Sequence, residues 1–227
     1  MVPNLPTGGR LSRGRLGSGG MSATRPSVKR RRVPRAPGER PGQILDAATR
    51  VLLRHGLDAT TIDGIAAEAG LGKGTVYEYF SSKAQVFTAL RRRCNEQILA
   101  AGTDAVAAGA EVGALDRIRR FVTGMIGFWA ANRRLVALLF HEAGIEEPDE
   151  LGPIRESLLE LVQDGVRAGE LAVRDPAFTV DFLLHGLRGV LEGWFAEGAA
   201  AEETAVESVL ARVDEVLTAL LNPTGRE

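Results

Sequence analysis

Apolar residues recur three or four positions apart from Pro41 almost to the C-terminal end of the sequence, and no stretch alternates apolar and polar residues as a β-strand does. The first pattern predicts a helix that begins near Pro41 and stops at Gly56. The last pattern, residues 206–220, has alternating steps of four and three, which is typical of a helix in a coiled-coil-like seam. The sequence therefore predicts an all-α fold.

Two short helices joined by a glycine-containing turn are predicted between Thr61 and Phe80. Thr60 or Thr61 suits the N-cap of the first helix, which Gly70 ends, and the second helix is expected to start at Lys73. A pair in which the first helix supports a solvent-facing second helix is a helix-turn-helix. The positions expected to face the core are Ile62, Ile65, Ala66, Leu71, Val76 and Phe80.

The outward side of the second helix carries residue types that suit a DNA groove. Lysine can donate to guanine acceptors, the threonine methyl can contact thymine, and tyrosine hydroxyls can reach phosphates. The alternative is that Tyr77 and Tyr79 cover the core as amphipathic aromatics. The common register of the caps and the apolar stripe favours DNA contact. The residues on this outward side are Lys73, Gly74, Thr75, Tyr77 and Tyr79.

The segment TTIDGIAAEAGLGKGTVYEYFSSKAQVFTAL, residues 60–90, resembles the DNA-binding domain of the tetracycline-repressor (TetR) family of bacterial regulators. The resemblance covers helices between residue 41 and about residue 100. It implies an N-terminal three-helix helix-turn-helix DNA-binding domain and a C-terminal helical domain that dimerises and holds a small effector. It also implies base contacts from Lys73, Gly74, Thr75 and Tyr77, and phosphate contacts from Thr61, Tyr79 and Lys83.

The N-terminal segment differs from the rest in charge. Residues 1–40 carry ten Lys and Arg against one acid, whereas the remainder carries 18 bases and 28 acids. We expect residues 1–40 to be a disordered basic arm that lies in a minor groove or along phosphates, and the alternative is a solvated tail. Met21 offers a second start, so the first twenty residues are interpreted as an upstream extension. The DNA-binding domain is expected at residues 41–100, the effector-binding and dimerisation domain at 101–222, and a disordered tail at 223–227.

The predicted helix from Asp175 to about Glu197 is apolar on two sides, so both sides must be buried. One side is expected to pack on its own subunit. The other side, with the seam of the last helix, is expected to form a four-helix bundle with a partner subunit. The alternative is that a monomer buries both sides. The residues expected in the homodimer interface are Val180, Leu184, Leu187, Leu191, Val206, Leu210, Val213, Leu217 and Leu220.

Aromatic and methionine side chains gather on the predicted inner faces of the C-terminal helices. They suit an apolar pocket for an unknown small-molecule effector, with His141, Glu142 and His185 as polar groups. The alternative is that each aromatic is ordinary core, because helical cores have the same pattern in sequence. The residues expected in this pocket are Phe121, Met125, Phe128, Trp129, Phe140, His141, Phe182 and His185, with Trp194 as a further candidate.

Nothing in the sequence favours an enzyme, a metal or a cofactor. The three histidines lie on separate elements without ligand spacing, and no phosphate loop or nucleophile elbow occurs. Cys94, the only cysteine, falls on an apolar stripe and is predicted to be a buried hydrophobic residue. No stretch reaches the length of a membrane span, so we expect a cytoplasmic protein without a membrane partner.

These features predict a sequence-specific transcriptional regulator that binds a palindromic operator in double-stranded DNA as a homodimer. We expect a repressor that a small, largely apolar ligand releases from DNA. The alternative is an architectural or partner-recruiting DNA-binding protein whose C-terminal domain binds protein and no small ligand. An enclosed pocket in that domain, or a solid core, distinguishes the two.

Overall fold

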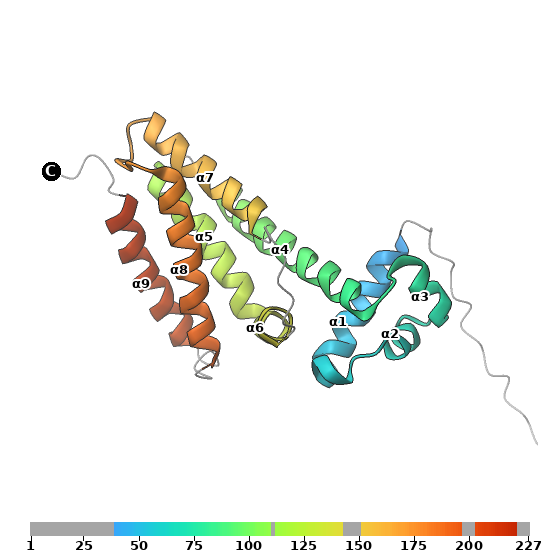
Figure 1. The fold of residues 1–227 in the computed structure, drawn as a ribbon. Helices are drawn as coiled ribbons and strands as arrows, with labels where there is room; N and C mark the ends of the chain where they lie inside the picture. The colour runs from blue at the N-terminus through green and yellow to red at the C-terminus, as the bar shows by residue number, and fades with distance from the viewer. Residues whose placement is uncertain (1–38, 110–111, 143–150, 197–202, 222–227) are drawn as a thin grey trace, which may run out of the picture. The chain divides into compact units, whose positions relative to one another are not determined.

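The computed structural model describes residues 39–109, 112–142, 151–196 and 203–221, all within one compact unit at residues 36–227 (Figure 1). These ranges are helical and contain no β-strand, so the predicted all-α class is confirmed. None of their helices is long and apolar enough to cross a membrane. The elements are α1 Arg40–Ala59, α2 Ile62–Ala69, α3 Lys73–Tyr79, α4 Lys83–Ala107, α5 Ala114–Ala131, α6 Arg133–Ala137, a π-helical turn Leu138–Glu142, α7 Gly152–Arg167, α8 Pro176–Ala196 and α9 Glu203–Leu221.

Two of the predicted segments, the basic arm before residue 39 and the tail at residues 223–227, lie outside the described residues. The predicted domain boundary at residue 100 falls inside α4, which continues to Ala107 without interruption. One continuous helix therefore belongs both to the helix-turn-helix region and to the C-terminal helices.

The helix-turn-helix forms where its caps and glycines predict it. The Thr61 Oγ1 accepts a hydrogen bond from the Gly64 N–H at 3.1 Å and caps α2. Gly70, with φ of +65°, ends α2 in the left-handed conformation that glycine adopts without strain. After the turn, α3 begins at Lys73 and ends one residue before Phe80. These signals set the length of both helices.

Two hydrogen bonds hold the end of α1 to the residues that precede α2 and to the start of α4. Gly56, with φ of +79°, interrupts the helical backbone of α1. Thr60 is fully buried, and its hydroxyl donates to the Gly56 carbonyl at 2.6 Å. The Lys83 ammonium, at the start of α4, donates to the Leu57 carbonyl at 2.7 Å. The helix-turn-helix is thereby held on α1 and α4.

α4 packs along α5 over much of its length. Its start is fixed by a reciprocal cap, in which Ser82 Oγ accepts from the Gln85 N–H at 3.2 Å and Gln85 Oε1 accepts from the Ser81 N–H at 2.8 Å. The two helices approach closely at Gly124, where a Cβ would lie 2.3 Å from the carbonyl oxygen of Ala101. Glycine is therefore required at this crossing.

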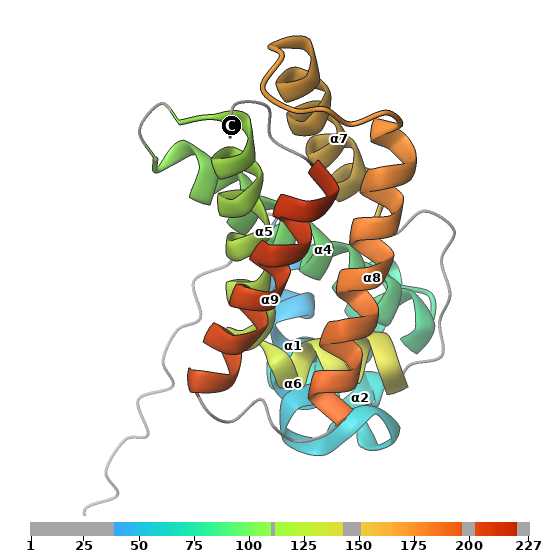
Figure 2. The same cartoon turned by 90° about the vertical axis from the view of Figure 1, so that its left-hand side faces the viewer.

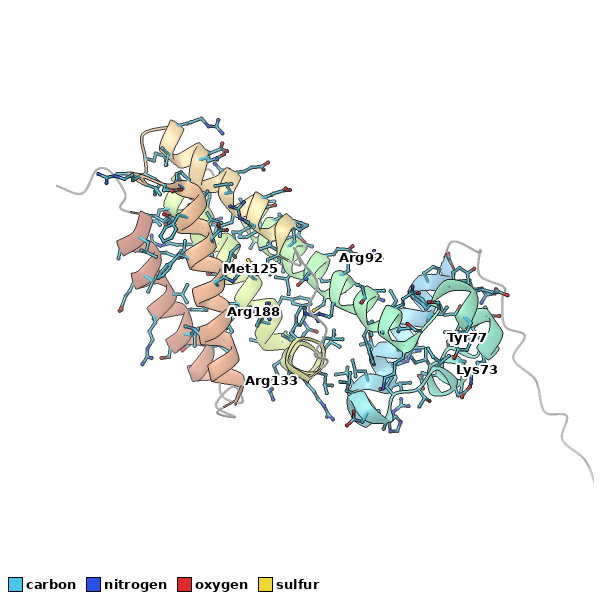
Figure 3. All side chains as sticks on the ribbon, in the orientation of Figure 1. Lys73, Tyr77, Arg92, Met125, Arg133 and Arg188 are labelled. Atoms are coloured by element: carbon cyan, nitrogen blue, oxygen red, sulfur yellow. The ribbon has the colours of Figure 1, made fainter. Side chains whose placement is uncertain are left out.

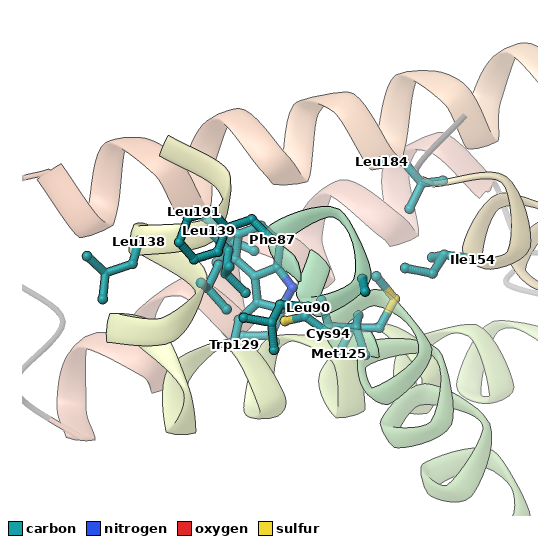
Figure 4. Close-up of a cluster of buried hydrophobic side chains, with 14 of the residues drawn as sticks. Phe87, Leu90, Cys94, Met125, Trp129, Leu138, Leu139, Ile154, Leu184 and Leu191 are labelled. Carbon is teal, nitrogen blue, oxygen red and sulfur yellow. The ribbon is translucent and has the colours of Figure 1, made fainter. Parts of the chain in front are cut away.

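A continuous cluster of buried side chains extends from α1 to α9, and Figure 4 shows part of it. Ile118, Val122, Met125 and Trp129 of α5 recur at helical spacing and are all buried, whereas Leu115 in the same pattern is half-buried. Cys94 of α4 is also buried, so its interpretation as a core residue is confirmed. The helical spacing in the sequence thus identified the inward faces of α4 and α5.

Ion pairs attach α8 and α9 to the rest of the protomer. Arg155 of α7 pairs with Asp181 of α8. Arg119 of α5 pairs with Asp214 of α9 and donates to Thr218 Oγ1 at 2.9 Å. Figure 2 shows the two helices beside each other on the face turned towards the viewer. Their rotation is therefore fixed by polar contacts as well as by apolar burial.

The rotation of α8 differs from the prediction. Val180, Leu184 and Leu191 were expected to meet a partner subunit, but they are buried in the protomer's own core, so this part of the predicted interface is wrong. Phe178 and Phe182, on the other side of α8, are 68% and 57% exposed. Because α8 is apolar on both sides, the packing of its neighbours decides which side faces inward.

Candidate DNA-binding surface, ligand cavity and dimer groove

The outer side of α3 presents most of its predicted base-contacting residues to solvent (Figure 3). Lys73 and Tyr77 are exposed, and Tyr77 retains 47% of its accessible surface. Gly74 is exposed with open space where a Cβ would stand, whereas Thr75 is half-buried at the edge of this side. Val76 points into the core. This arrangement leaves a convex, partly aromatic helix surface of the kind that enters a major groove.

The three predicted phosphate-contacting residues have different surroundings. Thr61 is exposed, and its Oγ1 accepts the capping bond of α2, which leaves its hydroxyl proton for a phosphate. Tyr79 is exposed at the end of α3. Lys83 is half-buried, bonded to Leu57, and its ammonium lies 5.4 Å from the ring centroid of Phe87. A phosphate contact from Lys83 would therefore share an ammonium that already joins α4 to α1.

The Lys73 ammonium donates to Asp63 Oδ2 on α2 at 2.8 Å. Both side chains are exposed, and the hydrogen bond to Asp63 raises the pKa of Lys73 above its ordinary value. Sequence analysis missed Asp63 because the two residues are ten positions apart, across the turn, where helical spacing gives no signal. The sole base of the two helices thus has a partner before DNA arrives.

Acidic residues outnumber basic ones in the helix-turn-helix. Residues 61–80 contain three acids and one base, Lys73. One acid, Glu68, is neutralised from α1 by Arg50 at 2.7 Å and Arg54 at 3.1 Å. The hydrogen bond from Arg50, followed by that from Arg54, lowers the pKa of Glu68. The two helices on their own therefore carry a net negative charge and do not attract a polyanion by charge.

A small apolar cavity of about 30 Å³ lies among α4, α5, α7 and α8. Met125 and Trp129, predicted to line an effector pocket, are both in its wall with Ile154 and Leu184, and Figure 4 shows Met125 on the side of Ile154. Arg188 is the one charged residue among the lining side chains. It lies four positions after Leu184, so a charge on the apolar stripe of α8 was the sequence signal that could have identified it.

The other predicted pocket residues are not brought to this cavity. Phe121 is buried against Gly102, and Phe128 is half-buried beside the core. Phe140 stacks on Trp129 with a centroid distance of 6.4 Å. Phe182 and His185 were expected in the pocket but are exposed on the outer side of α8, so their placement there was wrong. The side chains of His141, Glu142 and Trp194 lie outside those that the structure describes.

A groove of about 540 Å³ runs between α8 and α9 on the protomer's surface. Its wall includes Phe182, Val190 and Val216, which are all exposed apolar side chains. Of the residues predicted for the homodimer interface, Leu187 and Val213 line the groove. Val206 and Leu210 are partly buried, and Leu220 is exposed. Leu217 is buried in the core cluster, so its predicted place in the interface was wrong.

Arg91 is a further residue that sequence analysis did not single out. It is buried on α4, and its guanidinium lies 5.0 Å from the ring centroid of Phe140. A cation over an aromatic face is favourable, so this contact joins α4 to the π-helical turn after α6. Among the described side chains, no three His, Cys, Asp or Glu residues are grouped closely enough to hold a metal ion.

An all-α chain with a solvent-facing second helix in a helix-turn-helix is a DNA-binding protein of the helix-turn-helix class. Residues 44–90 match the family described as bacterial regulatory proteins, tetR family. Over this segment the protein is similar to the transcriptional regulators of this family.

Three similar proteins show how far the likeness extends. The transcriptional activator FasR of Mycolicibacterium smegmatis is 29% identical over 132 residues, which cover 58% of this chain and 59% of FasR. The transcriptional repressor SCO4008 of Streptomyces coelicolor is 27% identical over 157 residues, which cover 66% of this chain and 77% of SCO4008. The structure of FadR from Bacillus subtilis in complex with stearoyl-CoA is similar with a TM-score of 0.60, at 19% identity, over 82% of this chain and 99% of FadR.

Proposed function

We propose that this protein is a homodimeric repressor that leaves a palindromic operator when a small, largely apolar molecule binds its C-terminal helices. The observation that carries the proposal is the exposed apolar surface of α8 and α9 in a chain that also carries a helix-turn-helix. Phe178, Phe182 and Val216 expose large hydrophobic side chains beside the groove. Large apolar side chains that are exposed together on one surface mark an interaction site.

A second copy of the chain is the occupant that this surface suits best. Two copies of α8 and α9 can form a four-helix bundle around a two-fold axis, so that each groove receives the partner's aromatic side chains. Gly186, Gly189 and Gly193 lie in the groove wall, where a Cβ would meet nothing within 4 Å in the protomer. Their small size permits close approach of a partner helix. The interface would then consist of Phe178, Phe182, Leu187, Val190, Val213, Val216 and Leu220.

The dimer would present two α3 helices to successive major grooves, about 34 Å apart. We assign base contacts to Lys73, Gly74, Thr75 and Tyr77, of which Lys73 and Tyr77 are the exposed side chains with polar groups. We assign phosphate contacts to Thr61, Tyr79 and Lys83. The helix-turn-helix carries more acids than bases, so it lacks the positive charge that phosphates attract. The basic residues before residue 39 would supply these further phosphate contacts. Deletion of residues 1–38 should then reduce the salt dependence of DNA binding.

The effector would bind where Met125, Trp129 and Leu184 surround the small cavity. A volume of about 30 Å³ holds roughly one water, so a ligand would have to separate α7 and α8. A molecule that binds only this opened form lowers the population of the DNA-binding conformation. Bound DNA must in turn weaken the binding of that molecule. FadR was solved with stearoyl-CoA, which makes long-chain acyl compounds the first ligands to screen.

One observation favours a second candidate function, recruitment of a protein partner. The cavity inside the protomer is small, whereas the groove on its surface has a volume of about 540 Å³. A C-terminal domain that binds protein and no small ligand would have a small internal cavity and a large surface groove. Among the similar proteins, SCO4008 is a repressor and FasR is an activator.

The first experiment is to measure binding of the purified protein to genomic fragments, including the region upstream of its own gene, at two salt concentrations. Sedimentation then gives the protein-to-DNA stoichiometry. We expect a tight palindromic site occupied by a dimer, and release from that site by an acyl compound. Tight binding that no ligand relieves would favour partner recruitment. Weak binding without site preference would overturn the proposed function.

A further inference from the structure

Asp63 lies on a surface that an incoming DNA backbone would meet. It is in the first turn of α2, two residues after Thr61, to which we assign a phosphate contact. Its carboxylate is exposed and accepts the hydrogen bond from Lys73. The hydrogen bond between Lys73 and Asp63 therefore joins two groups with different expected roles. The Asp63 carboxylate lies near the expected path of the DNA phosphates, and the Lys73 ammonium is the group to which we assign a base contact.

The chemistry of possible acceptors decides what this pair can do. A lysine ammonium has three donors, and one is used by Asp63. A guanine edge offers neutral acceptors, which can share the ammonium with the carboxylate. A phosphate is an anion, so it competes with Asp63 for Lys73 and is repelled by that carboxylate at the same time. The pair therefore favours a base edge over the backbone as the acceptor for Lys73.

We propose that Asp63 is a specificity-determining residue, which restrains Lys73 from phosphates and keeps it available to base acceptors. This inference rests on the proposed role of α3 as the helix that contacts bases. Because both partners are exposed, the pair is weak and contributes little to folding. The pair should instead change how well the protein discriminates between DNA sequences, since non-specific binding depends mainly on phosphate contacts.

The test compares the wild-type protein with the Asp63→Asn variant on two DNA probes. One probe is the duplex that the wild-type protein selects from a randomised pool, and the other is a scrambled duplex of the same length. We expect the variant to bind the scrambled duplex about threefold to tenfold more tightly, with a log–log salt slope steeper by about one per protomer. Affinity for the selected duplex should change less, so the ratio of the two affinities falls.

Two further variants separate this mechanism from a general change in charge. In a Lys73→Met background, Asp63→Asn should no longer steepen the salt slope, because no ammonium is released. Glu96→Gln on α4 is a matched control, because Glu96 is exposed and pairs only loosely with Arg92, 3.9 Å away on the same helix. It removes one negative charge away from the helix-turn-helix and should leave the affinity ratio unchanged. Thermal denaturation checks that each variant is folded.

An affinity ratio unchanged by Asp63→Asn would overturn the inference. The same would follow if the variant steepened the salt slope equally in the Lys73→Met background, since the effect would then be independent of the pair. A wild-type protein that selects no sequence from the pool would overturn the proposed function itself, and this inference with it.

Discussion

Two adjacent residues of α3 show how burial separates a DNA contact from a core residue. Tyr77 has 47% of its surface exposed, whereas Val76 is fully buried. The exposure of Tyr77 argues against its being mainly a cover for the core, which was the alternative interpretation of this aromatic. The two positions therefore have opposite expected effects on stability and on DNA binding.

Tyr77→Ala should weaken binding to the selected duplex by about tenfold, a typical loss for one good contact, and should change the free energy of unfolding by less than about 1 kcal/mol. Val76→Ala should instead destabilise the fold by about 1–2 kcal/mol, because it leaves a cavity in the core. Urea denaturation and fluorescence anisotropy measure the two quantities. Large destabilisation by Tyr77→Ala would restore the interpretation of this side chain as core.

Among the helices, the crossing of α4 and α5 depends on Gly124. A Cβ at this position would lie 2.3 Å from the Ala101 carbonyl oxygen, which is backbone and cannot move aside without shifting α4. Gly127, one turn later on α5, has nothing within 4 Å of its Cβ position. The pair forms a matched test of close helix packing.

We predict that Gly124→Ala destabilises the protein by about 1–3 kcal/mol through overpacking, despite the better helix propensity of alanine. Gly127→Ala should be neutral or stabilise by up to about 1 kcal/mol, because only the propensity changes. The two changes in the free energy of unfolding are measured from the shift of the denaturation midpoint, provided that the dependence of that free energy on denaturant is the same for each variant. If the two variants had equal stability, the close approach of α4 and α5 at Gly124 would be contradicted.

The tie between α7 and α8 should be sensitive to acid. The hydrogen bond from Arg155 lowers the pKa of Asp181 below its ordinary value of 3.8, more than burial raises it. An acid with a lowered folded pKa contributes stability above its unfolded pKa and loses that contribution as the pH falls through its folded pKa. The contribution is therefore complete at neutral pH and decreases as the pH falls below 3.8 towards the lower folded pKa.

Asp181→Asn should accordingly lower the denaturation midpoint at pH 7 and have a diminishing effect as the pH falls below 3.8. The measurement is a pair of urea titrations across this range for the wild-type protein and the variant. Asp164→Asn, which breaks a pair with the largely exposed Arg167 on the same helix, provides a control in which a smaller effect is expected. A constant difference between wild-type protein and Asp181→Asn at every pH would contradict the assignment.

For the whole molecule, the proposed dimer places Phe182 in the buried centre of the interface. Phe182→Asp should raise the dimer dissociation constant about thirtyfold or more, because a charge would be buried among apolar side chains. DNA affinity should fall with it, since two linked half-sites bind far better than one. The folded protomer should retain its stability, because Phe182 is 57% exposed there.

Analytical ultracentrifugation across a concentration series measures the dissociation constant of the Phe182→Asp variant. Ala100→Asp, an exposed apolar-to-acid change on α4, controls for the added charge. A dimer that persists unchanged in Phe182→Asp would exclude the groove between α8 and α9 as the interface.

Periodicity and caps in the sequence were sufficient for the helix-turn-helix. The Thr61 cap and Gly70 act through neighbours within a few positions, so local sequence decides where α2 starts and ends. The inward residues of α5, such as Ile118 and Met125, followed equally from helical spacing. These features need no knowledge of distant parts of the chain.

Contacts between distant residues were beyond the reach of the same reasoning. The pair of Lys73 and Asp63 spans the turn, and Arg188 lines the same cavity as Met125 and Trp129 only after four helices have packed. No helical period relates these positions to each other. They became visible only as distances between side chains on different elements.

The sequence by itself determined an all-α chain, the position of the helix-turn-helix and the side of α3 that faces outward, because each depends on local spacing and hydrogen bonding. Only the tertiary structure decided which apolar side of α8 is buried in the protomer. Val180 and Phe182 are both apolar and differ by two positions, so hydrophobicity ranks them alike. The packing of α7 and the pairing of Arg155 with Asp181 turn Val180 inward and leave Phe182 at the surface.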